Sequence, residues 1–166
     1  MRNKKTKKSQ VVRIKAKAIY PDKLRLDVTS TLGIHVFSLA MQGDQVEYIL
    51  PREKKHYSGP SGARALRPIL QLPIDPLLFQ NMLFQKPVER KDWSCTTDGE
   101  ILKNCKKPLW AMTVEWQPPT KEGRLVRIDS RSASIQLHLD EYQSKFEEKQ
   151  STFQLKVPKK FKKYKL

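Results

Sequence analysis

The sequence predicts a mainly β (α+β) fold, a half-open antiparallel β-barrel of about 9–11 strands with a short two-helix lid. Three observations predict it. Apolar and polar residues alternate with period two in the first half of the chain, a helical interlude follows, and strand-like alternation then resumes. Runs of consecutive strands favour antiparallel pairing. A single sheet of this size tends to curl, and an amphipathic helical pair can plug its open side.

The strands are predicted from alternation, which is typical of a sheet with one wet and one dry face. In the first half, Pro21-Asp22 and Gly43-Asp44 supply turns between the alternating runs. The predicted strands cover residues 12–18, 24–29, 34–41, 46–50, 109–116, 125–128, 133–139 and 153–157.

The helical interlude lies between the two sets of strands. Ser61 can cap a short helix over 61–70, although Pro68 must kink or restart it. Asp75-Pro76 places an acceptor at the N-cap and proline at the first helical position. The helix that follows is apolar nearly all round, so we expect it to be covered on more than one side.

The chain contains two cysteines, Cys95 and Cys105, which flank the tight-turn dipeptide Asp98-Gly99. This spacing favours a disulfide across a hairpin, and the alternative is two unpaired thiols. A zinc site is not expected, because two cysteines without a companion His or Cys nearby supply too few ligands.

The formal net charge of +16 lies mostly in the two ends of the chain. Residues 1–8 carry five basic groups and residues 156–166 carry six, with no acid in either segment, which leaves +5 for the body. We therefore divide the chain into a basic segment 1–8, a single barrel domain 9–158 and a basic tail 159–166. Such tails indicate first solvated, mobile ends, and second contacts with anionic surfaces.

The sequence contains few residue patterns that would indicate a catalytic site or a metal site. His35, His56 and His138 fall on separate predicted elements, and neither a nucleophile elbow nor a phosphate loop occurs. We therefore predict no enzyme activity, no catalytic residues, no metal and no cofactor. Trp110 and Trp116 share a predicted strand face that carries no cation, which favours a buried wall over a nucleic-acid platform.

The order of these elements resembles a known family. Residues 22–33 read DKLRLDVTSTLG, residues 56–59 read HYSG, and residues 70–87 read LQLPIDPLLFQNMLFQKP. This resembles the bacterial outer-membrane lipoprotein receptor LolB and the lipoprotein carrier LolA. The family's final strand is similar to residues 153–158. The family usually has glycine at the end of its second helix, where this chain has Gln85.

The resemblance implies a non-catalytic protein that binds lipid or lipoprotein acyl chains in an apolar barrel cavity, as part of lipoprotein trafficking or outer-membrane biogenesis. We predict fourteen residues for its wall and lid. They are Leu24, Leu26, Val36, Leu39, Leu66, Ile69, Leu78, Met82, Leu83, Trp110, Met112, Val114, Ile135 and Leu137. An acyl chain gains about 0.8 kcal/mol per buried CH₂ in such a cavity.

The resemblance also implies a membrane-contact loop at Leu32 and Gly33, where an exposed leucine would engage the bilayer or help deliver cargo. The alternative is a leucine that folds back into the core. The implied location is the periplasm or the periplasmic face of the outer membrane. Met1 is followed by a basic segment rather than an apolar leader, so a signal sequence is not part of this pattern.

The expected partners are acyl chains, an anionic membrane surface and a carrier or receptor protein, and we expect a monomer. Two alternatives stay open. A basic nucleic-acid-binding protein would use the Lys/Arg-rich tails. A plain structural protein would fill the interior with its own side chains, which sequence cannot distinguish from a hollow barrel.

Overall fold

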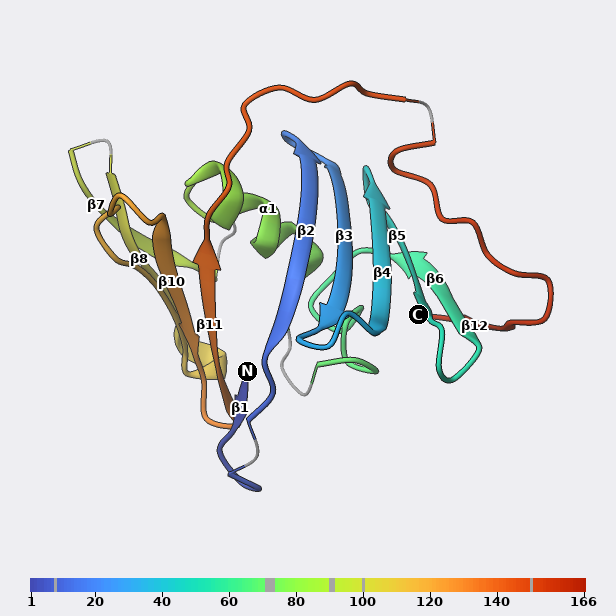
Figure 1. Ribbon diagram of the computed structural model, residues 1–166. Helices are drawn as coiled ribbons and strands as arrows, with labels where there is room; N and C mark the ends of the chain where they lie inside the picture. Colours follow the sequence, from blue (N-terminus) through green and yellow to red (C-terminus); the bar gives the residue numbers. More distant parts are fainter. Residues whose placement is uncertain (8, 71–73, 90–91, 100, 150) are drawn as a thin grey trace. The chain divides into compact units, whose positions relative to one another are not determined.

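The computed structural model describes residues 1–166 except 8, 71–73, 90–91, 100 and 150 (Figure 1). The described residues form two open six-stranded sheets and one short α-helix, so the mainly β prediction is confirmed. They hold twelve strands, one more than the upper number predicted. Lys8 of the basic segment and the Leu72-Pro73 part of the family-like link lie outside the described residues.

Contacts between residues divide the chain into two compact units, and each is described by itself. The β7–β11 unit contains residues 1–10 and 81–146, and the β2–β6 unit contains residues 11–80 and 147–166. Helix α1 (Pro76–Phe84) runs from the β2–β6 unit into the β7–β11 unit, with the division after Gln80.

The β2–β6 unit is built from five consecutive antiparallel strands with a sixth strand at one edge. Its strands are β2 (Val12–Ile19), β3 (Lys23–Ser30), β4 (His35–Gln42), β5 (Gln45–Leu50), β6 (Lys55–Pro60) and β12 (Lys162–Lys165). The predicted alternation holds best in β3, where Leu24, Leu26 and Val28 are buried between half-buried neighbours. This sheet therefore has one apolar face and one polar face.

The β7–β11 unit is also an antiparallel sheet, in the order β1-β11-β10-β9-β8-β7. Its strands are β1 (Arg2–Asn3), β7 (Ser94–Asp98), β8 (Ile101–Lys107), β9 (Met112–Trp116), β10 (Arg124–Asp129) and β11 (Ala133–Leu139). A 3₁₀ turn, η1 (Pro108–Trp110), precedes β9. Strand β9 therefore begins at Met112 and not at Leu109, because proline at the first position of the turn lacks the N–H that a strand ladder needs.

The predicted helix over 61–70 is wrong, since residues 63–69 form consecutive hydrogen-bonded turns instead. The amide of Arg67 donates to the carbonyl of Arg64 at 3.0 Å, and that of Ile69 donates to Leu66 at 3.0 Å. Pro68 lacks an N–H and disfavours the α conformation of the residue before it, so the segment does not propagate as a helix. The two-helix lid is reduced to one helix in the described residues.

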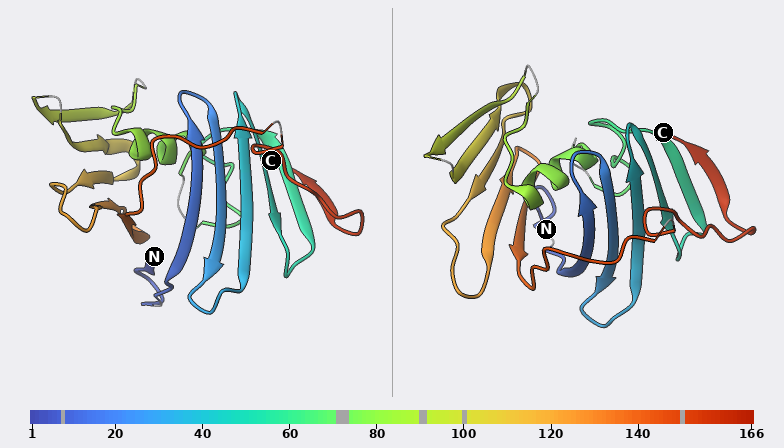
Figure 2. Two further views of the ribbon diagram at one scale, coloured as in Figure 1. Left: turned by 45° about the horizontal axis from the view of Figure 1, so that its top comes forward. Right: turned by 90° about the horizontal axis from the view of Figure 1, so that it is seen from above.

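The predicted strand over 153–157 is also wrong. Residues 151–161, here called the strap, cross the polar face of the β2–β6 sheet, opposite to the face on which α1 lies (Figure 2). Side chains of the sheet, rather than a neighbouring strand, satisfy its backbone. Gln42 Nε2 donates to the Phe153 carbonyl at 2.9 Å, Arg25 Nη1 donates to Gln154 at 3.0 Å, and the Leu155 amide donates to Glu47 Oε1 at 3.0 Å.

Both basic ends are tied into sheets, contrary to the prediction of mobile tails. Strand β12 pairs in parallel with β6, and Tyr164 stacks on Tyr57 with ring centroids 5.0 Å apart. Strand β1 pairs with β11, and Lys4 Nζ lies 2.7 Å from Asp129 Oδ2. Charge composition alone missed these contacts, because Tyr164 and Leu166, at alternate positions, let the lysine-rich C-terminal segment pack one face on the sheet.

Candidate functional site

The apolar face of the β2–β6 unit carries three of the predicted wall residues. Leu26 pairs with Leu39, and Leu39 pairs with Tyr48 on the next strand. The side chains of Leu26, Leu39 and Tyr48 are all buried, with Leu39 and Tyr48 at 0% exposure. The buried residues of this face include Leu24, Leu26, Val28, Leu39, Met41, Val46 and Tyr48. It is covered, so these residues do not line an open cavity in this structure.

The predicted wall residue Val36 does not continue this face. A β-bulge at Val28/Thr29 pairs Val28 with Phe37 and Thr29 with His35, which leaves Val36 without a partner in the register. A bulge interrupts the period-two alternation by one residue. Phe37, which lies two residues from Leu39 on the same side of β4, is the residue opposite Val28.

The cover of this face is the segment formed by residues 61–70 and 74–80, here called the cover segment. Tyr48 Oη donates to the Ala65 carbonyl at 3.1 Å, and Gln80 Nε2 donates to the Ile19 carbonyl at 2.8 Å. Of the predicted lid residues, Leu66 and Leu78 are buried here and Ile69 is half-buried. A few polar contacts and apolar packing therefore hold the cover segment on the sheet.

The start of α1 has the N-cap that the sequence predicts. Asp75 Oδ1 accepts from the Leu77 amide at 3.0 Å and from Ser61 Oγ at 3.1 Å. An aspartate in this position satisfies a backbone donor that the helix leaves free. The same carboxylate therefore joins the two parts of the cover segment.

The remaining predicted wall and lid residues belong to the β7–β11 unit. Val114 pairs with both Ile128 and Cys105, and Ile128 pairs with Ile135, which makes a buried apolar face. Met112 and Met82 are buried as well, whereas Leu137 and Leu83 are half-buried. The fourteen predicted residues are thus divided between two units, each with its own apolar face.

Trp110 lies outside that apolar face and contacts a lysine instead. Lys107 Nζ lies 3.6 Å from the centre of the Trp110 ring and 5.8 Å from that of Trp93. It also lies 2.5 Å from Asp92 Oδ2, and the Lys107 side chain is only 7% exposed. The buried ammonium is therefore stabilised by a carboxylate and an aromatic face. The sequence prediction that Trp110 lines an acyl-chain wall is not supported by this position.

A buried arginine, which the sequence analysis missed, holds the end of α1. Arg124 Nε donates to the Gln117 carbonyl at 2.9 Å, Nη2 donates to Leu102 at 3.0 Å, and Nη1 donates to Gln85 Oε1. Burial lowers the pKa of Arg124 from its ordinary value. Gln85 has a φ of 54°, the left-handed conformation that helix ends favour and that glycine adopts most easily.

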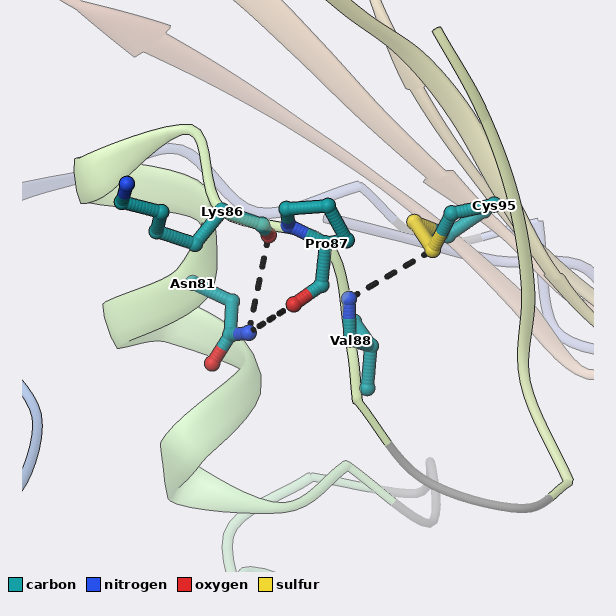
Figure 3. Close-up of a disulfide and its surroundings, with 6 residues drawn as sticks. Asn81, Lys86, Pro87, Val88 and Cys95 are labelled. Atoms are coloured by element: carbon teal, nitrogen blue, oxygen red, sulfur yellow. Dashed lines mark hydrogen bonds between the residues drawn. A yellow bond between two sulfur atoms is a disulfide. The ribbon is translucent and has the colours of Figure 1, made fainter.

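Cys95 and Cys105 form the disulfide across the β7–β8 hairpin, at directly opposed positions of the register (Figure 3). The hairpin is linked to the end of α1. The Val88 amide donates to Cys95 Sγ at 3.4 Å, and Asn81 Nδ2 donates to the Pro87 carbonyl at 2.7 Å (Figure 3). The disulfide therefore anchors the segment that leaves the helix.

The predicted membrane-contact loop is exposed. Leu32 is 85% exposed, and Ile34 and Val11, which lie at the same end of the β2–β6 sheet, are 54% and 70% exposed. The loop is closed by the Gly33 amide donating to the Ser30 carbonyl at 2.9 Å and by the Ile34 amide donating to Ser30 Oγ at 3.1 Å. Gly33 has a φ of 78°. This geometry holds Leu32 away from the core.

A Ser, His and Asp cluster on the polar face lacks the order of a catalytic triad. His35 Nε2 lies 2.8 Å from Ser38 Oγ, and Ser38 donates to Asp27. In a triad the carboxylate orients the histidine and the histidine takes the serine proton. Here serine lies between the other two and is 1% exposed, so it is a buried structural link.

Among the residues that the structure describes, no three His, Cys, Asp or Glu side chains gather closely enough to hold a metal ion. No helix in the described ranges is long and apolar enough to cross a membrane.

Comparison with known proteins adds no relative: neither a family model, nor a curated protein, nor a solved structure matches the chain.

Proposed function

We propose that this protein binds lipid or lipoprotein acyl chains without catalysis and exchanges them at a membrane surface. The expected setting is lipoprotein trafficking or outer-membrane biogenesis in the periplasm. The half-open barrel and the single domain over 9–158 that the resemblance implies belong to this proposal. So do the expected partners, namely an anionic membrane and a carrier or receptor protein.

The observation that carries the proposal is the apolar tip formed by Val11, Leu32 and Ile34. An isolated exposed apolar side chain is ordinary, but three at one end of a sheet form a patch. Burying a leucine side chain gains about 1.5–3 kcal/mol. A hydrogen-bonded loop that keeps Leu32 in water therefore supports a role for this tip in contact with another apolar phase.

The acyl chain would bind on the apolar face of the β2–β6 unit in place of the cover segment. Displacing that segment exchanges one apolar contact for another, so the net loss of hydrophobic stabilisation is small. The polar contacts that must break are few. They include the bonds from Tyr48 to Ala65 and from Gln80 to Ile19.

The test of the tip is a charge substitution with a matched control. We expect Leu32→Glu to weaken association with vesicles of zwitterionic and anionic phospholipid by about tenfold to a hundredfold, because a charged side chain does not enter hydrocarbon. Leu109→Glu changes a leucine of similar exposure, 78%, in the β7–β11 unit. Equal vesicle binding by both variants and the unmodified protein would contradict the role of the apolar tip in membrane contact.

The test of acyl-chain binding is uptake of a fluorescent phosphatidylcholine from those vesicles. We expect stoichiometric uptake by the unmodified protein. Uptake should be slower in the Leu32→Glu variant and unchanged in the Leu109→Glu variant. Absence of uptake, with no lipid found by mass spectrometry of the purified protein, would contradict the proposal.

Nucleic-acid binding is the second candidate, and one observation favours it. Arg13, Lys15 and Lys17 alternate along the edge strand β2, and all three are exposed. A cationic stripe of this kind can follow a phosphate backbone. Tight, salt-sensitive RNA binding that Arg13→Gln/Lys15→Gln abolishes, in a protein that takes up no lipid, would reverse the ranking.

A further inference from the structure

A groove of about 360 Å³ lies in the β2–β6 unit, beside strands β6 and β12. None of the fourteen residues predicted for the cavity takes part in it. The groove is lined by Tyr57, Arg64, Arg67, Pro68, Lys165 and Leu166. It combines apolar lining residues with three cationic residues, two arginines and a lysine, which is the composition of a site for an anionic amphiphile.

The floor is built by the unpredicted edge strand β12. Tyr57 stacks on Tyr48 on one side and on Tyr164 on the other, with ring centroids 4.9 and 5.0 Å apart. Leu166 lies against Gly59, where an added Cβ would come within 3.0 Å of the Leu166 Cβ. The close fit of Leu166 on a glycine and the tyrosine stack hold this floor in place.

The two arginines are held on one side of a tight turn. The Arg67 amide donates to the Arg64 carbonyl at 3.0 Å, and side chains separated by three residues in such a turn lie one above the other. The residues between them, Ala65 and Leu66, are buried, and Tyr48 Oη binds the Ala65 carbonyl. The anchored side of the turn therefore leaves both arginines on its exposed side.

The charges of the groove are not balanced by acids. No described side-chain carboxylate forms an ion pair with Arg64, Arg67 or Lys165, and no acidic side chain lines the groove. Even with the carboxylate of Leu166 counted, the lining has an excess of positive charge. Like charges on neighbouring positions repel, so this arrangement favours an anion.

We propose that the groove binds the phosphate head group of an anionic phospholipid. Guanidinium groups match phosphate oxygens in pairs of hydrogen bonds, which favours phosphate among anions. This inference rests on the proposed function, because the acyl chain would continue from Tyr57 to Tyr48 and onto the apolar face under the cover segment. The head group would thus bind to the same segment that the chain displaces.

The test compares two short-chain lipids that dissolve as monomers, dihexanoyl phosphatidylglycerol and dihexanoyl phosphatidylcholine, by calorimetric titration. The variant is Arg64→Gln/Arg67→Gln. Its matched control, Arg13→Gln/Lys15→Gln, removes two exposed charges at the other edge of the same sheet. A third titration uses inorganic phosphate alone.

We expect the unmodified protein and the control to prefer the anionic lipid. The groove variant should lose about fivefold to tenfold in affinity for the anionic lipid and less than about twofold for the zwitterionic one. Replacing the arginines by lysine, in Arg64→Lys/Arg67→Lys, should restore part of the preference, because the charge stays and the paired geometry is lost.

Three results would overturn the inference. The first is equal affinity of the unmodified protein for both lipids, and the second is a loss of affinity in the control as large as that in the groove variant. Either result would overturn the inference without contradicting acyl-chain binding. Phosphate alone binding as tightly as the anionic lipid would make the groove a phosphate site without a lipid. Binding of neither lipid would instead refute the proposed function itself.

Discussion

The two units of this protein stabilise similar antiparallel sheets by different means. The β7–β11 unit has a disulfide across its outer hairpin and two buried cations, Lys107 and Arg124, whose partners lie on several elements. Among its described residues, the β2–β6 unit has neither a disulfide nor a buried lysine or arginine. Its apolar face is buried beneath a cover segment that a few neutral hydrogen bonds retain.

From this difference we expect local opening to cost more free energy in the β7–β11 unit than in the β2–β6 unit. Buried charges are costly to leave unpaired, so they oppose local opening. A segment held by apolar packing and single hydrogen bonds opens at a lower free energy. Under the proposed function, the β2–β6 unit is therefore where we expect an apolar ligand to enter.

The largest effect is expected at Arg124. Arg124→Ala removes the donors to the buried carbonyl of Leu102 and to the part-buried carbonyl of Gln117, and it should lower the free energy of unfolding by about 3–5 kcal/mol. Urea titration monitored by circular dichroism measures it. Hydrogen exchange should show the loss in the β7–β11 unit, and a loss confined to the β2–β6 unit would break the comparison.

The disulfide comes next. Its two cysteines are separated by ten positions, and a loop of this length is worth up to about 3 kcal/mol. Cys95→Ser/Cys105→Ser, or reduction, should lower the melting temperature and increase hydrogen exchange in the β7–β8 hairpin and in residues 86–88. The amides of β3 and β4 should not change, and the double variant itself should not respond to reductant.

A smaller effect is expected at Tyr48, where one substitution should lower the stability of the protein and raise the rate of lipid uptake. Tyr48→Phe removes the bond to the Ala65 carbonyl and should cost about 1 kcal/mol of stability. Because this bond holds the cover segment, the same variant should take up fluorescent lipid faster. Tyr142→Phe, on an exposed tyrosine of the other unit, is the control. Slower uptake by Tyr48→Phe would contradict the role of the segment as a removable cover.

The smallest effect concerns acid stability through Asp27. Burial raises the pKa of Asp27, but hydrogen bonds from Arg25 and Ser38 and the charge of Arg25 together hold it below 3.8, its ordinary value. A depressed pKa stabilises the folded protein above pH 3.8, and the contribution is lost as the pH falls through the folded pKa. Since the carboxylate is partly exposed, Asp27→Asn should cost less than about 1 kcal/mol at pH 7. The difference from the unmodified protein should shrink below pH 3.8, and a constant difference would refute this assignment.

The sequence predicted the elements that local chemistry decides. Leu24 and Leu26 alternate with polar residues and are buried, Asp98-Gly99 closes the hairpin that the disulfide joins, and Asp75 caps α1. Leu32 is exposed, as the resemblance implied, whereas the sequence left open the alternative of a leucine folded back into the core.

The failures arose where distant residues decide the conformation. The strap has the composition of a strand, yet its backbone is bound by Arg25, Gln42 and Glu47, which are more than 100 positions away. Strand β12 and the groove depend on Tyr164 meeting Tyr57, which no local pattern encodes. Pro108 was a local signal that could have moved the predicted start of the strand from Leu109 to a position after Trp110.

The most direct test of the central claim is a methyl NMR spectrum recorded with a phosphatidylcholine that carries a nitroxide on its acyl chain. The account predicts that the methyl signals of Leu24, Leu26 and Leu39, which are buried under the cover segment, broaden in the presence of the spin-labelled lipid and recover after chemical reduction of the nitroxide. Bound lipid that leaves these signals sharp would contradict acyl-chain binding on the apolar face of the β2–β6 unit.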